Sequence, residues 1–335
     1  MDSGGCLRTG DDRLLPMSWK RSLIVLLLAS VPSGAFSFEG PLQVRNQFPL
    51  LLTLSPPYLE SAGVRDSVSV GLSHSSVYVI ETSQEWTFNT DLELTELDLR
   101  LRKKMGGRTE IGMHIPVLRP TAGFLDAQLA SLHDALGTGD YGRSARPDNE
   151  FLYTITYQGK PVIQGVNART GFGDISLTLK RQLRAASPVI SVMAEIEAPT
   201  GDAQTGYGNG SWDLGVALLS EWDMGAVYRG YAMIGLVSPG DLKAYQAIPL
   251  RMFGYAGLGI EAAWWERFHV LVQTVAASSP LPETGIRQLD WPGILLTFGG
   301  RYSFDRSSIE FSLTEDPDTA GAPDFIANVG WTQKF

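Results

Sequence analysis

The sequence predicts an all-β protein, a transmembrane antiparallel up-and-down β-barrel of about 12–14 strands with short periplasmic turns and long extracellular loops. Three observations predict it: the pattern of the last strand, the spacing of the strands before it, and the division of their residues between two faces. In residues 325–335 (FIANVGWTQKF), the side chains that share a face with Phe325 and Phe335 are mostly apolar, and those on the other face are mostly small or polar. A last strand that ends on an aromatic residue is typical of bacterial outer-membrane barrels. We expect Trp331 and Phe335 to form a C-terminal assembly signal for the barrel-assembly machinery.

The N-terminus carries the export signal that such a barrel needs. Lys20 and Arg21 precede a short apolar run, and the small residues Ala35 and Ser37 follow it. The run is shorter than the roughly 20 residues of a spanning helix. The sequence therefore predicts a signal peptide over 1–37, with Phe38 as the first residue of the mature chain.

The composition excludes several classes of function. The only cysteine, Cys6, lies in the predicted signal peptide, so disulfides, thiol catalysis and cysteine metal sites are not expected in the mature chain. The chain has 27 Lys+Arg against 36 Asp+Glu, a net charge of −9, which argues against nucleic acid as a partner. The four histidines share no metal-ligand spacing. We expect no metal and no cofactor.

Residues 38–65 are rich in proline and leucine and do not alternate cleanly. We expect them to occupy the barrel lumen as a plug; a periplasmic extension and an irregular first strand are the alternatives. From Asp66 to the end, the barrel domain 66–335, strand patterns recur at hairpin spacing. They cover 67–80, 86–102, 111–117, 151–157, 161–166, 174–184, 189–198, 211–222, 227–237, 250–264, 268–278, 293–304, 308–314 and 325–335.

This series of strands has one irregular strand, two possible strand counts and one long interruption. A change of phase around Thr95–Glu96 predicts a β-bulge. If 151–157 and 161–166 both span the membrane the count is 14, and if they form an external hairpin it is 12. Leucines at helical spacing in the long interruption 119–149 predict a short amphipathic helix over Gly123–Leu136, either in the barrel mouth or on the outer surface.

With the apolar face of each strand turned outward, many charged residues fall on the inner face. A soluble barrel would bury these charges at high cost, whereas a membrane barrel lines a polar lumen with them. The inward set is Glu93, Asp98, Arg100, Arg102, Glu110, His114, Asp174, Lys180, Glu195, Glu197, Asp213, Arg251, Glu261, Arg301 and Glu310. We expect selectivity to be set by Arg100, Arg102, Glu195, Glu197, Asp213, Arg251, Glu261, Arg301 and Glu310.

Several short motifs carry a resemblance to known proteins. They are Gly40–Pro49, Leu72–Tyr78, Gly139–Arg143, Gly171–Asp174 leading to Leu179–Lys180, Glu197–Gly201 and Gly206–Ser211. Over most of the mature chain these motifs resemble the bacterial outer-membrane barrels grouped as DUF3187. The Gly-x-Gly-Asp, Pro-Thr-Gly and Gly-x-Gly-Ser elements are also similar to outer-membrane proteins of the phenol meta-pathway type, which are assumed to pass hydrophobic substrates. The resemblance implies the barrel fold and transfers no catalytic or binding residue.

His74 and Ser76 are the candidate catalytic residues. They lie two apart on the face predicted to meet lipid, as in outer-membrane lipid hydrolases that use a Ser–His pair. Here Val77 follows the serine where those enzymes have asparagine, and no outward-facing acid on 86–102 is expected to orient the histidine.

The sequence therefore predicts a non-enzymatic barrel of the bacterial cell outer membrane, a passive channel or uptake protein for small molecules, hydrophobic ones included. Its partners would be outer-membrane lipid and lipopolysaccharide, the assembly machinery and an unknown solute. A lipid hydrolase using His74 and Ser76 and a structural barrel with a closed lumen are the alternatives.

Overall fold

The computed structural model describes residues 37–52, 54, 58–129, 131, 146–318 and 320–335. The signal peptide predicted over 1–37 lies outside the described residues except for Ser37, as does most of the helix predicted over Gly123–Leu136 and all of the motif 139–143. Chain contacts divide the protein into Met1–Gly34 and Ala35–Phe335, and all residues that the structure describes belong to the second unit.

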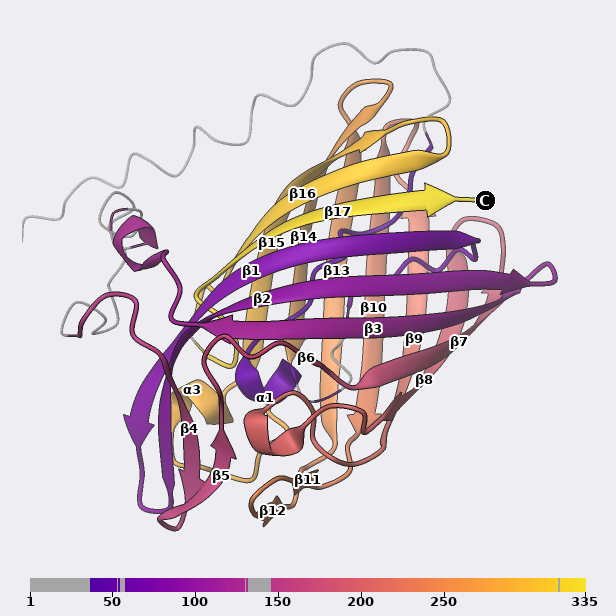
Figure 1. Ribbon diagram of the computed structural model, residues 1–335. Helices are drawn as coiled ribbons and strands as arrows, with labels where there is room; N and C mark the ends of the chain where they lie inside the picture. The colour runs from indigo at the N-terminus through magenta and orange to yellow at the C-terminus, as the bar shows by residue number, and fades with distance from the viewer. Residues whose placement is uncertain (1–36, 53, 55–57, 130, 132–145, 319) are drawn as a thin grey trace, which may run out of the picture. The chain divides into compact units, whose positions relative to one another are not determined.

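In the described part of the chain, twelve antiparallel strands close into a barrel (Figure 1). Each strand pairs with the next in the order given, and the last pairs with the first. They are β1 (Ser67–Thr82), β2 (Trp86–Met105), β3 (Thr109–Thr121), β7 (Ile175–Arg184), β8 (Val189–Ala198), β9 (Asp213–Asp223), β10 (Tyr228–Ser238), β13 (Phe253–Ala263), β14 (Phe268–Ala277), β15 (Gly293–Ser303), β16 (Ser307–Glu315) and β17 (Phe325–Lys334). The predicted all-β barrel is confirmed at the lower strand count.

The lower count arises because β2 is longer than the strands around it. Its first half, Trp86–Asp91, pairs with β4 (Leu152–Tyr157), and its second half pairs with β3. β4 continues into β5 (Lys160–Gln164) as a hairpin beyond the barrel wall, so these two segments do not add spanning strands. The remaining short strands are β6 (Gly171–Phe172), which pairs with β3, and the β11 (Leu242–Lys243)–β12 (Ala247–Ile248) hairpin.

The β-bulge predicted at Thr95–Glu96 is wrong. β2 pairs with β1 and with β3 in continuous register across these residues. The apolar residues change face instead: Leu92 and Leu94 are buried inside, whereas Leu97 is 46% exposed on the outside. In the sequence, this change in the face that the leucines occupy looks the same as the shift of register that a β-bulge causes.

Helical structure is sparse, with α1 (Pro49–Leu52), the 3₁₀ turn η2 (Ala203–Thr205), α3 (Arg287–Asp290) and a helical turn at 126–129. None of the helices in the described ranges is both long enough and apolar enough to cross a membrane.

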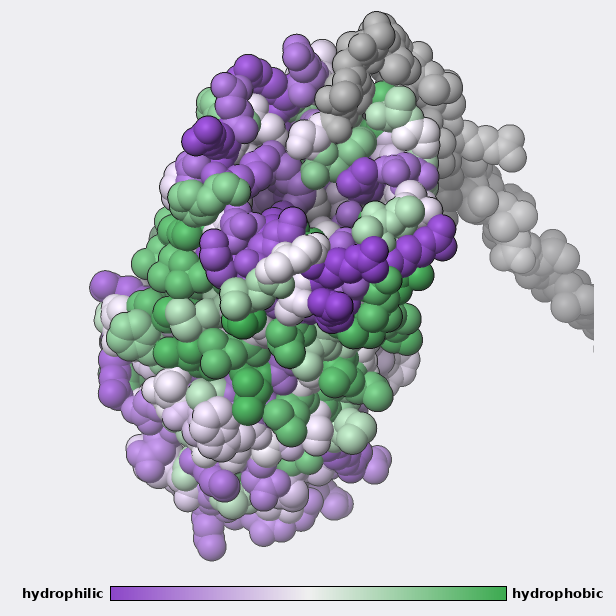
Figure 2. Space-filling view, turned by 90° about the vertical axis from the view of Figure 1, so that its right-hand side faces the viewer, coloured by the Kyte–Doolittle hydropathy of each residue, from purple (hydrophilic) through white to green (hydrophobic). Residues whose placement is uncertain are grey.

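Hydrophobic side chains gather on the outer face of the strands. In Figure 2 they form a band, with hydrophilic side chains above and below it. Along β9 and β10 the outward residues Leu214, Val216, Ile234 and Leu236 are each more than half exposed, while their neighbours point inward and are buried. Strand alternation thus gives an apolar outside and a separate, partly charged inside.

The end of the barrel with the long loops is filled by a hydrophobic cluster. It includes Phe48 and Leu50 around α1, Trp86 and Phe88 of β2, and Ile155 of β4, all less than 5% exposed. The first half of β2 and the β4–β5 hairpin supply the residues that cover this end (Figure 1). The described residues of 37–66 lie against the inner face of the barrel.

Candidate functional site

The inner face of the barrel carries buried charges in unequal numbers. Eight buried carboxylates on the strands face inward: Glu96, Asp98, Glu110, Glu197, Asp213, Glu221, Glu261 and Glu310. The buried inward-facing cations are Arg100, Arg102, Lys180 and Arg301. Buried charges are stable only where they are paired or hydrogen-bonded, so their partners define what occupies the interior.

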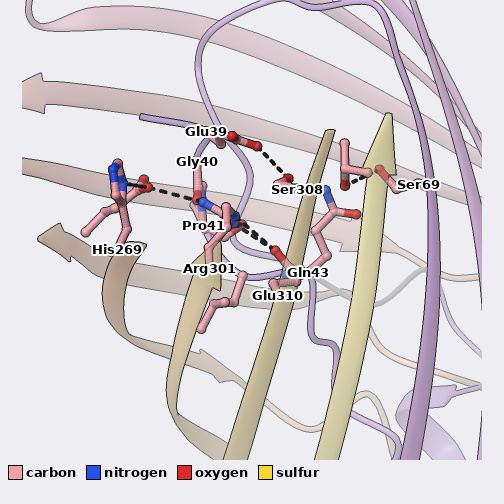
Figure 3. Close-up of polar contacts among 12 residues, drawn as sticks. Glu39, Gly40, Pro41, Gln43, Ser69, His269, Arg301, Ser308 and Glu310 are labelled. Atoms are coloured by element: carbon pink, nitrogen blue, oxygen red, sulfur yellow. Dashed lines mark hydrogen bonds and ion pairs between the residues drawn. The ribbon is translucent and has the colours of Figure 1, made fainter. Parts of the chain in front are cut away.

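The N-terminal segment (37–66) supplies many of those partners, beginning at Glu39. The Glu39 carboxylate accepts a hydrogen bond from Ser308 Oγ at 2.7 Å (Figure 3). It also accepts one from Ser303 Oγ at 2.6 Å, and Lys334 Nζ lies 2.7 Å away. Burial alone raises the pKa of Glu39. The bonds from Lys334, Ser303 and Ser308, with the charge of Arg301, outweigh burial and lower the pKa below 4.5. Glu39 is therefore held ionised at neutral pH.

Arg301 of β15 holds the next residues of the segment. Its guanidinium donates to the carbonyl oxygens of Gly40 at 2.7 Å and Pro41 at 3.1 Å (Figure 3). The same guanidinium pairs with Glu310 at 2.8 Å and Glu261 at 3.3 Å. Arg301 thus joins the segment to two acidic residues of the wall.

Two further wall residues bind the backbone of the segment here. Glu310 Oε1 accepts from Gln43 N at 2.8 Å. The Gln273 side chain accepts from Leu42 N at 2.8 Å and donates to Leu42 O at 3.1 Å. The wall thus satisfies backbone groups that would otherwise be buried without a partner.

Further along, charged side chains of the segment pair with β2. Arg45 Nε lies 2.7 Å from Glu96 Oε1, and Gln47 Nε2 donates to Glu96 Oε2 at 2.8 Å. Glu60 lies 2.7 Å from Arg102. Burial raises the pKa of Glu60, but the charges of Arg102 and Lys180 outweigh it and lower the pKa to about 2.

The end of the segment contacts β3, β7 and β9. Ser61 Oγ donates to Glu221 at 2.6 Å, and Arg65 N donates to Glu110 at 2.7 Å. Lys180 Nζ donates to Ser61 O at 3.1 Å and also pairs with Glu110 at 2.9 Å. Between the described part of the segment and the wall, a cavity of about 40 Å³ remains, lined by Tyr58, Glu60 and Arg100 among others. It has room for a few water molecules.

Most of the predicted selectivity residues lie on the inner face. They are Arg100, Arg102, Glu195, Glu197, Asp213, Glu261, Arg301 and Glu310. Arg251 does not join them, because it lies exposed in the loop before β13. Their role in selectivity stays a prediction. The segment residues that pair with them were missed, because 38–65 has no alternating pattern that would orient its side chains.

His74 lies on the outer face, as predicted, but with an unexpected partner. Glu93 also faces outward, and its Oε2 lies 2.6 Å from His74 Nε2. Thr95 Oγ1 lies 2.8 Å from His74 Nδ1. The inward assignment of Glu93 is wrong because Leu92 and Leu94 face the interior cluster rather than the outside.

Glu93 also fixes the start of the insertion 122–151 on the outer surface. Its Oε1 accepts from Phe124 N at 2.8 Å and Leu125 N at 2.5 Å, and the Phe124 ring stacks on His74 at 5.1 Å. Of the two positions expected for the insertion, the outer surface is the observed one for these residues. Ser76 is fully buried, and both ring nitrogens of His74 are engaged by Glu93 and Thr95.

The glycine-rich motifs converge at the long-loop end of the barrel. The Asp174 carboxylate accepts from Gly201 N at 2.7 Å and Asn209 N at 3.0 Å, and Asn209 Nδ2 donates to both oxygens of Asp213 at 2.8 Å. Burial raises the pKa of Asp174 despite these backbone hydrogen bonds. A Cβ on Gly208 would lie 2.4 Å from Asp174 Oδ2, so this position has room only for glycine. The motifs therefore join the residues before β7 to the loop between β8 and β9.

The barrel was compared with solved structures. The COG4313 outer membrane channel from Pseudomonas putida F1 aligns with a TM-score of 0.55 and 16% identity, over 84% of this chain and 100% of that one. The NanC porin aligns at 0.47 and 8%, over 80% and 100%, and the Pseudomonas putida toluene transporter TodX at 0.40 and 12%, over 88% and 99%. At these identities the first alignment shows a shared fold and not a shared solute.

A search of curated proteins found no match to the chain. The family model described as "Protein of unknown function (DUF3187)" matches residues 20–335. This match covers the whole barrel and the segment inside it, and the chain belongs to the DUF3187 family.

Proposed function

We propose that the protein is an outer-membrane channel for small polar solutes whose lumen is closed at rest by the N-terminal segment. In this proposal 1–37 is a signal peptide, the mature chain begins at Phe38, and the channel performs no catalysis. The observation that supports it is the division of the barrel into an apolar outside and a charged inside, with the described residues of 37–66 bound to the charged side chains of the inner face.

The chemistry of the interior favours polar solutes. A hydrophobic solute that crossed it would cover the carboxylates and guanidinium groups of the wall without replacing their hydrogen bonds. The segment, in contrast, brings Arg45 and Glu60 as counter-charges and backbone groups as partners for Arg301 and Gln273. A solute that replaces the segment needs similar polar groups.

One observation favours the hydrolase alternative. His74 contacts Glu93 through one ring nitrogen and Thr95 through the other, so an acid, an imidazole and a hydroxyl are linked in a row. Acyl transfer also needs N–H donors for the oxyanion. The strands that carry these residues are paired on both edges along this stretch, β1 with β17 and β2, and β2 with β1 and β3, so their backbone N–H groups are engaged in the sheet. We therefore propose that this cluster anchors the insertion 122–151.

The test is the conductance of the refolded mature chain, 38–335, in a planar bilayer, beside a chain that begins at Asp66. We expect the full chain to be closed most of the time and the shortened chain to conduct steadily. Because the shortened chain could misfold, Arg301→Gln in the full chain provides a second route: it removes the bonds to Gly40 and Pro41 and should raise the open probability. Folding of each protein is checked by the heat-dependent shift of its mobility on gels.

Steady conductance by the unmodified full chain would contradict closure by the segment. Silence from all three folded proteins would contradict the channel itself. In that case, cleavage of a phospholipid that is lost in both His74→Ala and Thr95→Val would favour the hydrolase.

A further inference from the structure

An apolar groove of about 420 Å³ lies on the outer face of β1, β2, β3 and β7, near the short turns. Its floor is a row of outward-facing apolar residues on adjacent strands, in which Val68 pairs with Leu101, Leu101 with Met113, and Met113 with Leu177. One step nearer the turns, Lys103 pairs with Ile111. The groove therefore has an apolar floor and a cation at one end.

Other cations surround that end. Arg108 of the β2–β3 turn is exposed near it, as is Arg181 of β7, which shares the outer face with Leu177. Arg181 pairs in register with Thr109, two residues from Ile111 on β3, so Lys103 and Arg181 lie on opposite sides of β3. Arg181 Nη1 donates to a neutral partner, Thr109 Oγ1, at 2.7 Å.

The anionic groups nearby are fewer. Asp66 lies 3.1 Å from Lys103 Nζ, and the terminal residue Phe335 donates its N–H to Asp66 O at 3.2 Å, which brings the chain's carboxylate to the same side. Within the described ranges, Arg108 and Arg181 form no salt bridge with a carboxylate, whereas Lys104 N donates to Asp66 Oδ1 at 2.9 Å. In a chain with a net charge of −9, this is a local excess of positive charge.

We propose that this groove binds one anionic phospholipid of the inner leaflet. The phosphate would lie between Lys103 and Arg181, and an acyl chain would lie on Leu101, Met113 and Leu177. The inference rests on the outer-membrane placement proposed above, which puts the short turns at the periplasmic side. A guanidinium and an ammonium bind phosphate oxygens through charge-assisted hydrogen bonds. Zwitterionic lipids carry their own cation near the phosphate, so an anionic headgroup fits better.

The test uses native mass spectrometry of the refolded mature protein in a neutral detergent. Equal amounts of dimyristoyl phosphatidylglycerol and dimyristoyl phosphatidylcholine are added, so that only the headgroup differs. We expect one phosphatidylglycerol to be retained with a preference of about tenfold, which corresponds to roughly one to two cation contacts at a membrane surface. The double variant Lys103→Gln/Arg181→Gln should lose most of this preference.

The matched control is Arg267→Gln/Arg306→Gln, which removes two exposed cations at other short turns and should keep the preference. Met113→Trp keeps all the cations but fills the groove, and should lower the retention of phosphatidylglycerol. Equal retention of the two lipids by the unmodified protein, or an equal loss of preference in the control pair, would overturn the proposal.

Conductance separates this proposal from the channel proposal. Lys103 and Arg181 face away from the lumen, so their replacement should leave conductance unchanged. A protein that retains phosphatidylglycerol but never conducts would contradict the channel alone, and one that conducts without a lipid preference would contradict the lipid site alone.

Discussion

At the scale of single residues, buried carboxylates stabilise this protein in two ways: some accept hydrogen bonds from backbone N–H groups of loops, and others pair with cations. Asp174 accepts hydrogen bonds from two backbone N–H groups of the β8–β9 loop, and Glu93 accepts them from two N–H groups at the start of the insertion. Others, such as Glu96, are buried against a cation of the N-terminal segment. The first kind organises loops and the second holds the segment.

Gly208→Ala tests the loop junction. The added Cβ would lie 2.4 Å from Asp174 Oδ2, so either the carboxylate or the loop must move. We expect a loss of about 1–3 kcal/mol of unfolding free energy, as for other insertions into packed sites. Gly107→Ala is the control, since a Cβ there meets nothing within 4 Å. Urea unfolding of both variants in micelles is the measurement, and equal stability of the two would contradict the prediction.

Arg45→Met tests the buried pair with Glu96. The two side chains are 4% and 1% exposed, so the change leaves a buried carboxylate without its cation. Removal of one partner of such a pair costs about 3–5 kcal/mol, whereas replacement of both by apolar residues is often close to neutral. We therefore expect Arg45→Met/Glu96→Leu to recover most of the unfolding free energy that Arg45→Met loses. An additive loss in the double variant would show that the pair is not coupled.

At the scale of elements, the N-terminal segment is bound to the barrel wall through its backbone groups, although its described residues form no β-strand. Gln273 binds both backbone groups of Leu42, and Arg301 binds two successive carbonyl oxygens. These contacts come from the inner faces of β14 and β15, whose edges are already paired. The segment can therefore leave without disturbing the barrel's hydrogen bonds.

The attachment at Glu39 should depend on pH. The pKa of Glu39 lies below 4.5 in the folded protein. Ionised Glu39 therefore stabilises the attached segment fully above the ordinary pKa of a glutamate. This stabilisation is lost as the pH falls through the lower pKa of the folded protein. We expect the open probability of the full chain to be constant from pH 7 to about 5 and to rise below about 4.5. Single-channel recordings over this range measure it.

Glu39→Gln is the companion variant. It should raise the open probability at pH 7 and flatten the rise at acid pH. A pH profile identical to that of the unmodified chain would show that Glu39 does not hold the segment.

At the scale of the whole molecule, the interior of the barrel carries a net negative charge. Eight buried carboxylates face four buried cations on the strands, and in the segment Glu39 and Glu60 offset Arg45 and Arg65. The lumen is therefore negative with or without the segment, while the outer face is apolar. A negative pore concentrates cations and excludes anions.

We expect the open channel to prefer potassium over chloride in reversal potentials across a KCl gradient. Glu195→Gln should weaken that preference, because Glu195 lies on the inner face and lines the cavity between the wall and the N-terminal segment. Asp148→Asn, on the exposed insertion, is the control and should leave the reversal potential unchanged. Anion preference in the unmodified channel would contradict the sign of the lumen.

Much of the architecture could be predicted from local pattern. The spans of β9, β10 and β13 to β17 follow from period-two alternation, and the alternation of short turns with long loops predicts the barrel. Prediction failed at β2, where Leu92 and Leu94 form part of the interior cluster. Alternation shows that two sets of residues lie on opposite faces, but an apolar residue fits an interior cluster and an outer surface equally well. For the same reason Glu93 was predicted to face inward, and its contact with His74 was missed.

By itself the sequence determined the strands, the chemistry of most faces and the presence of a non-alternating segment before the barrel, because these depend on neighbours a few residues apart. The tertiary structure decided that β4 and β5 stay outside the wall, that Arg301 and Glu39 lie together, and that the glycine motifs meet at Asp174. Each of these is a contact between residues far apart in the chain. Such contacts depend on which surfaces remain unpaired once the barrel has closed, and no local period encodes that.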